Sequence, residues 1–152
     1  MTPQIAIALT VGVAATVDDI ARRQISNWIP ALAFVGGLSA MALDQGWRGA
    51  GSSLLGAVVG FAVFLVFYLL GGMGGGDVKL MAGFGAVLGT ERLLEAALWT
   101  AAFGGLMAVA ALALGTVRRR IRHTPESGSG VQAIPYAPAI AIGAWLALIP
   151  KM

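Results

Sequence analysis

The sequence predicts an all-α fold, a polytopic membrane helix bundle with about six transmembrane helices. Apolar residues make up 58% of the 152 residues and charged residues 11%, whereas a soluble domain is about half apolar and about a quarter charged. Apolar stretches follow one another along the whole chain with short connections between them. The 22 glycines provide small-residue surfaces of the kind through which membrane helices pack. We therefore expect lipid to be the main solvent of this chain.

Composition also excludes several kinds of chemistry. The sequence contains no cysteine and a single histidine, His123, which excludes disulfides, thiolate metal sites and cysteine nucleophiles. One histidine cannot by itself supply a Ser-His-Asp triad or a two-histidine metal site. The net charge of +3 is too small to indicate a nucleic-acid partner. We therefore expect no metal, no cofactor and no nucleic acid.

The expected spans are apolar segments separated by polar or glycine-containing connections: 2–17, 28–43, 50–70, 78–89, 93–116 and 133–149. The first lacks the basic region and cleavage site of a secretory signal, so it is expected to stay as a helix of the mature protein. Segments 50–70 and 93–116 cross a hydrocarbon core of about 30 Å comfortably. Segment 78–89 covers only about 18 Å, so its length alone permits a re-entrant hairpin.

The basic residues decide between these topologies, because Lys and Arg accumulate on the cytoplasmic side. With six spans and an outer N-terminus, the inner connections hold seven of the ten basic residues: Arg22, Arg23, Lys79, Arg118, Arg119, Arg120 and Arg122. A fourth segment that turned back would split the charges evenly. We therefore expect six spans, both termini on the periplasmic side, one integral-membrane domain over 1–152 and a flexible cytoplasmic loop at 118–132.

Glycines within the spans predict close helix contacts. Gly56 and Gly60 form a GxxxG pair, and Gly83, Gly104 and Gly105 are further points where helices are expected to approach. The sequence leaves open whether the chain forms a homo-oligomer.

Three aspartates, Asp18, Asp19 and Asp77, lie at the predicted cytoplasmic ends of spans, and carboxylates at membrane depth are functional candidates. The remaining acidic residues are expected to be solvated: Asp44, Glu91, Glu95 and Glu126.

Only one of the two adjacent aspartates can face a cleft, because neighbouring side chains of a helix point about 100° apart. The helix face below Asp19 carries small residues, Thr16, Ala15, Gly12 and Ala8, and the face below Asp18 carries Ala14, Val11 and Ile7. Small residues suit contact inside a bundle, so Asp19 is the inward candidate. The alternative is an exposed ion pair of Asp19 with Arg22 or Arg23 at the helix end.

Asp77 follows a glycine-rich run, Gly71-Gly72-Met73-Gly74-Gly75-Gly76. Its simplest role is to cap the next helix. Five glycines in six positions exceed what a cap requires, however, and a backbone without side chains lets an extended peptide approach closely. The run lacks the Gly-Lys-Ser/Thr ending of a phosphate loop.

These residues resemble the motifs of a known family. Gly74-Gly75-Gly76-Asp77 with Val78-Lys79-Leu80 resembles the GxGD motif of the type IV prepilin peptidases, polytopic aspartic proteases of bacterial inner membranes. The segment 19–27 resembles the other motif of that family, an aspartate followed six residues later by Ile-Pro-Asn, with Ser26 in place of the proline. Ile134-Pro135-Tyr136-Ala137-Pro138 continues the resemblance, which covers essentially the whole chain.

The resemblance implies a catalytic dyad of Asp19 and Asp77 and cleavage of prepilin leaders at the cytoplasmic membrane interface. The residues it places at the substrate are Gly74, Gly75, Gly76, Lys79, Arg23, Asn27 and Pro135. Lys79 and Arg23 have a simpler alternative role, anchoring at lipid headgroups, and Pro135 has one as the start of the last helix. The partners implied are a prepilin and the lipid bilayer.

The chain resembles the short, peptidase-only branch of the family that serves Flp or tight-adherence pili. Larger members carry a cysteine-rich N-terminal region and also methylate the new N-terminus, and this sequence has no cysteine. We therefore expect no methyltransferase activity.

Two neighbouring carboxyl groups in a partly dry site share a proton, which supplies one base and one acid. A helix N-terminus at Asp77 favours its ionised form, so Asp19 is the expected proton carrier. Asp18→Asn is expected to remain active.

The alternative function, from a different class of membrane protein, is that of a small ion-coupled transporter or channel in which Asp19 and Asp77 bind a cation. A protease of the presenilin type is disfavoured by the short chain.

Overall fold

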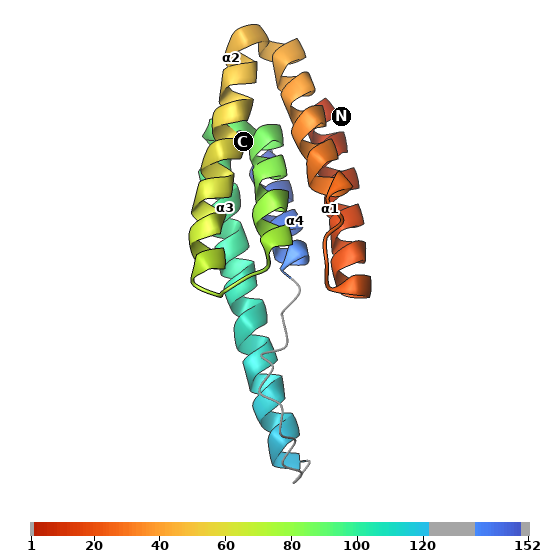
Figure 1. Ribbon diagram of the computed structural model, residues 1–152, viewed down its shortest axis with the longest axis vertical. Coiled ribbons are helices and arrows are strands. Elements are labelled where there is room, and N and C mark those ends of the chain that lie inside the picture. Colours follow the sequence, from red (N-terminus) through yellow and green to blue (C-terminus); the bar gives the residue numbers. More distant parts are fainter. Residues whose placement is uncertain (1, 122–135, 150–152) are drawn as a thin grey trace.

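The computed structural model describes residues 2–121 and 136–149, and its elements there are the helices α1 (Pro3–Arg22), α2 (Trp28–Leu69), α3 (Gly75–Ile121) and α4 (Ala137–Leu148) (Figure 1). The predicted all-α membrane bundle is confirmed. Within the described ranges, α1, α2 and α3 are long and apolar enough to cross a membrane, and α4 is a shorter apolar helix.

Two of the helices bend sharply at glycines. The kink of α2 lies at Gly46, with φ 60° and ψ −139°, and that of α3 at Gly89, with φ 65° and ψ −176°. Positive φ values are readily adopted by glycine because it has no Cβ. Each bend divides its helix into two arms, 28–45 and 47–69 in α2, and 75–88 and 90–121 in α3, so the bundle consists of the predicted six segments. Figure 1 shows α2 folding back on itself at the top of the molecule.

Several boundaries differ from the prediction. The helix α3 begins at Gly75, so the last two residues of the glycine run form its first turn. It continues to Ile121, because arginine is a good helix former, so the predicted loop at 118–132 is wrong over 118–121. The rest of that loop and Pro135 lie outside the described residues.

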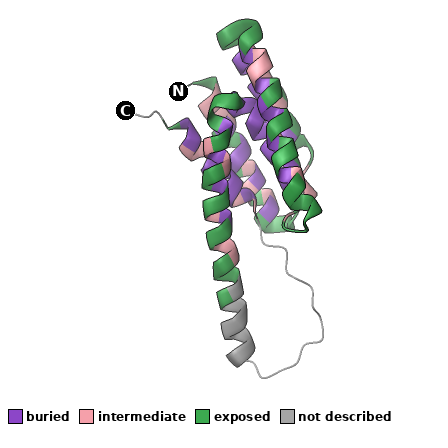
Figure 2. Ribbon diagram, turned by 90° about the vertical axis from the view of Figure 1, so that its left-hand side faces the viewer, coloured by how far each residue is buried: buried purple, intermediate pink, exposed green. Residues whose placement is uncertain are grey.

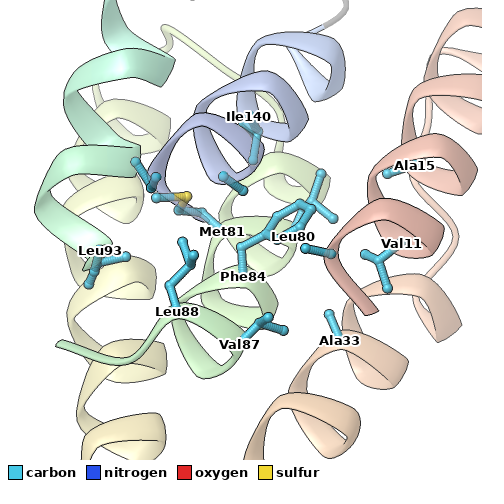
Figure 3. Close-up of a cluster of buried hydrophobic side chains, with 14 of the residues drawn as sticks. Val11, Ala15, Ala33, Leu80, Met81, Phe84, Val87, Leu88, Leu93 and Ile140 are labelled. Atoms are coloured by element: carbon cyan, nitrogen blue, oxygen red, sulfur yellow. The ribbon is translucent and has the colours of Figure 1, made fainter. Parts of the chain in front are cut away.

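The N-terminal arm of α3 forms the centre of the bundle. Its buried hydrophobic residues are at most 4% exposed: Val78, Leu80, Met81, Phe84, Ala86, Val87 and Leu88. Phe84 packs with residues of the surrounding helices, among them Val11, Ala33, Leu93 and Ile140 (Figure 3). This arm coincides with the predicted span that is too short to cross the membrane comfortably, and it is enclosed by protein.

Glycines let the two arms of α2 approach this central arm. A Cβ on Gly37 would lie 2.6 Å from the backbone nitrogen of Val87, and one on Gly83 would lie 2.8 Å from the carbonyl oxygen of Pro30. On the other arm, Gly56 lies directly against Gly85. These distances leave no room for a side chain, so the backbones themselves are in contact.

The predicted glycine contacts are confirmed with one exception. Gly60 faces the carbonyl oxygen of Met81, and Gly104 faces the ring of Tyr136. A Cβ on Gly105, in contrast, would meet nothing within 4 Å. The prediction for Gly105 is wrong because consecutive residues of a helix point in different directions, and only Gly104 faces α4.

The helix α4 lies between α1 and the C-terminal arm of α3. Gly143 of α4 packs against Thr100 of α3, and the indole of Trp145 lies over Gly12 of α1. The indole N–H of Trp145 donates a hydrogen bond of 2.9 Å to the carbonyl oxygen of Ala8. Figure 2 shows buried residues where the helices face one another and exposed residues on the outside. The connections 23–27 and 70–74 and the start of α4 meet at one end of the bundle (Figure 1).

We predict that Gly56→Ala lowers stability by about 1–3 kcal/mol, because the added methyl group forces the tightly packed backbones of α2 and α3 apart. Thermal unfolding of the purified protein in detergent measures this. Gly51→Ala in the same arm is the control, since a Cβ there meets nothing within 4 Å, and it is expected to cause no loss. Equal stability of the two variants would contradict the proposed backbone contact.

Candidate active site

A pocket of about 580 Å³ opens at the end of the bundle that contains the connections 23–27 and 70–74. Its polar lining contains both candidate carboxylates, Asp19 from the last turn of α1 and Asp77 from the first turn of α3. The two residues are 58 positions apart in sequence, and the packing of α1 and α2 around the central arm of α3 brings them together. Each is only 7% exposed, and both line the same pocket.

Asp19 lies on the buried face of α1, as the sequence predicts. Ala8, Gly12 and Ala15 below it are also buried. The backbone N–H of Ala137, in the first turn of α4, donates a hydrogen bond of 3.0 Å to Oδ2 of Asp19. The carboxylate therefore accepts a free N–H group at a helix start, where the helix dipole favours negative charge.

Asp77 is held in a similar way by its own helix. The backbone N–H of Gly74 donates to its Oδ2 at 3.1 Å, and the N–H of Asp77 donates to the carbonyl oxygen of Gly74, also at 3.1 Å. This reciprocal pair resembles a capping box, in which a side chain of the first turn reaches back to the residue before the helix. Asp77 therefore stabilises the start of α3 and still lines the pocket.

A helix N-terminus lies beside each carboxylate. Because both carboxylates have one, the helix dipole does not favour Asp19 over Asp77 as the carrier of the shared proton. Each carboxylate accepts its backbone hydrogen bond through Oδ2. As far as the described residues show, Oδ1 of each is the oxygen available for a water or a peptide.

Asp18 faces away from the pocket, and it is Asp18 rather than Asp19 that pairs with arginine. Nε of Arg22 lies 3.4 Å from its Oδ1, and the backbone N–H of Ser26 donates to its Oδ2 at 2.8 Å. The ion pair at the helix end that was considered for Asp19 is therefore formed by Asp18.

Most of the residues predicted to contact the substrate line the same pocket: Arg23, Asn27, Gly74, Gly75, Gly76 and Lys79. Nζ of Lys79 donates a hydrogen bond of 2.9 Å to Oδ1 of Asn27, which joins the start of α3 to the connection between α1 and α2. Pro135, the other predicted residue, lies outside the described part of the chain.

The sequence reasoning missed an apolar wall of the pocket. It consists of Phe61, Leu65 and Tyr68 of α2, whose spacing of four and then three residues places them on one helix face. That spacing is a usable signal, but in an apolar span it does not distinguish a pocket from a surface that faces lipid. Among the described residues, no three histidine, aspartate or glutamate side chains are placed to hold a metal ion.

Comparison with known proteins gives matches to one family. Residues 6–109 match the model of the type IV leader peptidase family, a range that includes both Asp19 and Asp77. The chain is 38% identical over 109 residues to a prepilin leader peptidase/N-methyltransferase of Bacillus subtilis, with 70% of this chain and 38% of the relative covered.

A protein of the same name from Pseudomonas aeruginosa is 36% identical over 104 residues, with 64% of this chain and 32% of the relative covered. The chain thus spans about a third of the length of these curated relatives, and no solved structure matches it. The match of the family model to more than half of the sequence, together with these bacterial relatives, shows that the chain belongs to the type IV leader peptidase family.

Proposed function

We propose that this chain is a membrane aspartic endopeptidase that cleaves the leader peptide of type IV, Flp-like prepilins at the cytoplasmic membrane interface. The observation that carries the proposal is the meeting of Asp19 and Asp77, from different helices, in one pocket at the end of an apolar bundle. Relatives named prepilin leader peptidase support the substrate class.

In the proposed mechanism, the two carboxyl groups share one proton, because both cannot easily be ionised in a partly buried site. The ionised aspartate takes a proton from a water molecule, whose oxygen attacks the scissile carbonyl carbon. The protonated aspartate donates to the carbonyl oxygen, where negative charge develops. The tetrahedral intermediate then collapses and the C–N bond breaks. The proton taken from the water passes to the leaving amine, and a hydroxyl of the intermediate returns a proton to the other aspartate as the C=O bond re-forms, so the dyad is restored.

The pocket offers a place for an extended leader peptide. Gly74, Gly75 and Gly76 line it without side chains, so a peptide backbone can approach the pair of carboxylates. The apolar wall of Phe61, Leu65 and Tyr68, which lines the same pocket, suits apolar side chains near the cleavage site. The apolar helix of the prepilin would remain in the bilayer beside the enzyme.

The proposed location is the bacterial inner membrane, with the chain forming one membrane domain, the pocket on the cytoplasmic side and both termini on the periplasmic side. Arg23 and Lys79 line the pocket, and Arg22 lies beside Arg23 in the last turn of α1. The positive-inside rule therefore supports this orientation.

We predict that Asp19→Asn and Asp77→Asn each lower the rate of prepilin cleavage by about 100-fold or more, because either change removes an acid or base of the dyad. The measurement is the appearance of the shortened pilin when purified enzyme and a Flp-like prepilin are combined in proteoliposomes. Full activity in either variant would overturn the dyad.

Asp44→Asn is the matched control, because Asp44 is exposed and lies near the Gly46 bend, away from the pocket. It is expected to cleave at the wild-type rate. The transporter alternative predicts a different result. The wild type would carry cations into the same vesicles without cleaving prepilin, and both dyad variants would lose this flux.

We predict that Gly75→Ala raises KM about 3–10-fold and leaves kcat nearly unchanged. The added methyl group occupies space in the pocket where the peptide backbone would lie, so it weakens peptide binding. A Cβ on Gly75 would lie 3.6 Å from Tyr68, so the helix itself accommodates it. Gly72→Ala, in the same glycine run but outside the pocket lining, is the control. If the two variants have the same KM, the peptide does not lie along Gly75.

We predict that the new pilin N-terminus released by this chain carries no methyl group, since the proposed activity is that of the peptidase-only branch. Mass spectrometry of the product, formed with S-adenosylmethionine present, measures this. A methylated product would place the chain with the bifunctional enzymes.

A further inference from the structure

The connection between α1 and α2, residues 23–27, forms one wall of the pocket. Arg23, Gln24, Ile25 and Asn27 all line it, as do residues of the first turn of α3. A Cβ on Gly76 would lie 3.2 Å from Cβ of Ile25, so the connection packs tightly against the glycine that precedes Asp77. The width of the pocket therefore depends on where this connection is held.

The connection starts with an unfavourable backbone conformation. Arg23 has φ 53° and ψ 32°, in the left-handed region, and its N–H donates to the carbonyl oxygen of Asp19 at 2.8 Å. In the described residues it is the one non-glycine residue with positive φ. Such a conformation persists when surrounding contacts hold it, so an anchor further along the connection is required.

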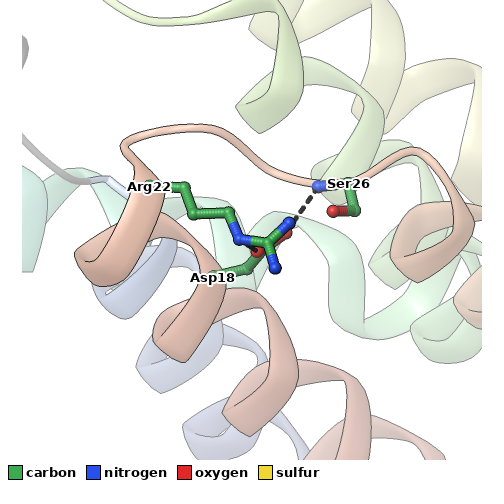
Figure 4. A network of polar contacts seen from close by, with 3 residues as sticks. All are labelled: Asp18, Arg22 and Ser26. Atoms are coloured by element: carbon green, nitrogen blue, oxygen red, sulfur yellow. Dashed lines mark hydrogen bonds and ion pairs between the residues drawn. The ribbon is translucent and has the colours of Figure 1, made fainter.

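Asp18 provides that anchor. The backbone N–H of Ser26 donates to Oδ2 of Asp18 at 2.8 Å, across eight residues of sequence, and Arg22 contacts the other oxygen (Figure 4). The side chain of Asp18 is 14% exposed and that of Arg22 is 73% exposed. A short hydrogen bond to a carboxylate is stronger than an exposed ion pair, so the contact with Ser26 is the one that holds the connection.

The far end of the connection is tied to α3. Asn27, next to Ser26, accepts the hydrogen bond from Lys79, and Lys79 is two residues after Asp77. The wall is thus fixed to α1 through Asp18 and to α3 through Lys79, and these are the two helices that carry Asp19 and Asp77.

We propose that Asp18 is a positioning residue, which holds the 23–27 wall against the pocket through the N–H of Ser26 and thereby sets the affinity for the peptide. Asp18 lies outside the pocket that holds the dyad. Two adjacent aspartates therefore have different roles, Asp19 in the proposed catalysis and Asp18 in positioning the wall. This inference rests on the proposed peptidase function.

The test compares Asp18→Ala, Asp18→Asn and Arg22→Gln in the prepilin cleavage assay. Asp18→Ala removes the acceptor for the N–H of Ser26, so KM is expected to rise about tenfold with kcat within about twofold of wild type. Asp18→Asn keeps an acceptor oxygen and is expected to restore most of the affinity. Arg22→Gln removes only the exposed ion pair and is expected to change KM by less than about twofold. An unchanged KM in Asp18→Ala, or a loss of kcat alone, would overturn the proposal.

Amide hydrogen exchange of the full chain in proteoliposomes provides a readout that does not need activity. Residues 23–27 are expected to exchange faster in Asp18→Ala than in the wild type and Asp18→Asn. In a Ser26→Pro background, residue 26 has no N–H to donate, so Asp18→Ala is expected to add no further increase. An equal increase in both backgrounds would show that Asp18 acts by another route. If the wild type cleaves no prepilin, the proposed function fails, and the exchange result still decides whether Asp18 anchors the wall.

Discussion

The direct backbone contact between Gly56 of α2 and Gly85 of α3 is the constraint on which the arrangement of the bundle depends. A short helical arm occupies the centre only if the helices around it approach without side chains between them. Once the central arm is enclosed, its N-terminus lies at the end of the bundle where α1 also ends. The position of Asp77 relative to Asp19 is therefore a consequence of helix packing far from either carboxylate.

The two carboxylates share one structural device. Each uses one oxygen to accept an N–H group at the start of a helix, from Ala137 for Asp19 and from Gly74 for Asp77. Such N–H groups have no partner within their own helix, so each carboxylate satisfies a donor that the helix itself leaves without an acceptor. This arrangement fixes two acidic groups in a partly dry pocket and keeps one oxygen of each for chemistry. Stability and proposed catalysis are thus served by the same bonds.

Much of the fold was predictable because span length, apolar composition and charge placement act locally. The differences arise where local signals are ambiguous. The glycine run predicts a loop up to Gly76, yet the helix begins at Gly75, since Asp77 completes the first turn by bonding back to Gly74. The loop predicted at 118–132 begins with arginines, but arginine favours helix and α3 continues through Ile121. Gly104 and Gly105 are indistinguishable by composition, and only the direction of α4 separates them.

Composition and pattern alone predict a helical membrane bundle in which Asp19, rather than Asp18, faces inward, because hydrophobicity and helical periodicity are properties of single segments. They also indicate which glycines and aspartates to consider. The folded arrangement was needed to see that two residues 58 positions apart line one pocket, that Tyr68 and its neighbours on α2 form the apolar wall, and that Asp18 bonds to the adjoining connection. These features depend on contacts between segments distant in sequence, and such contacts are set by how the helices pack.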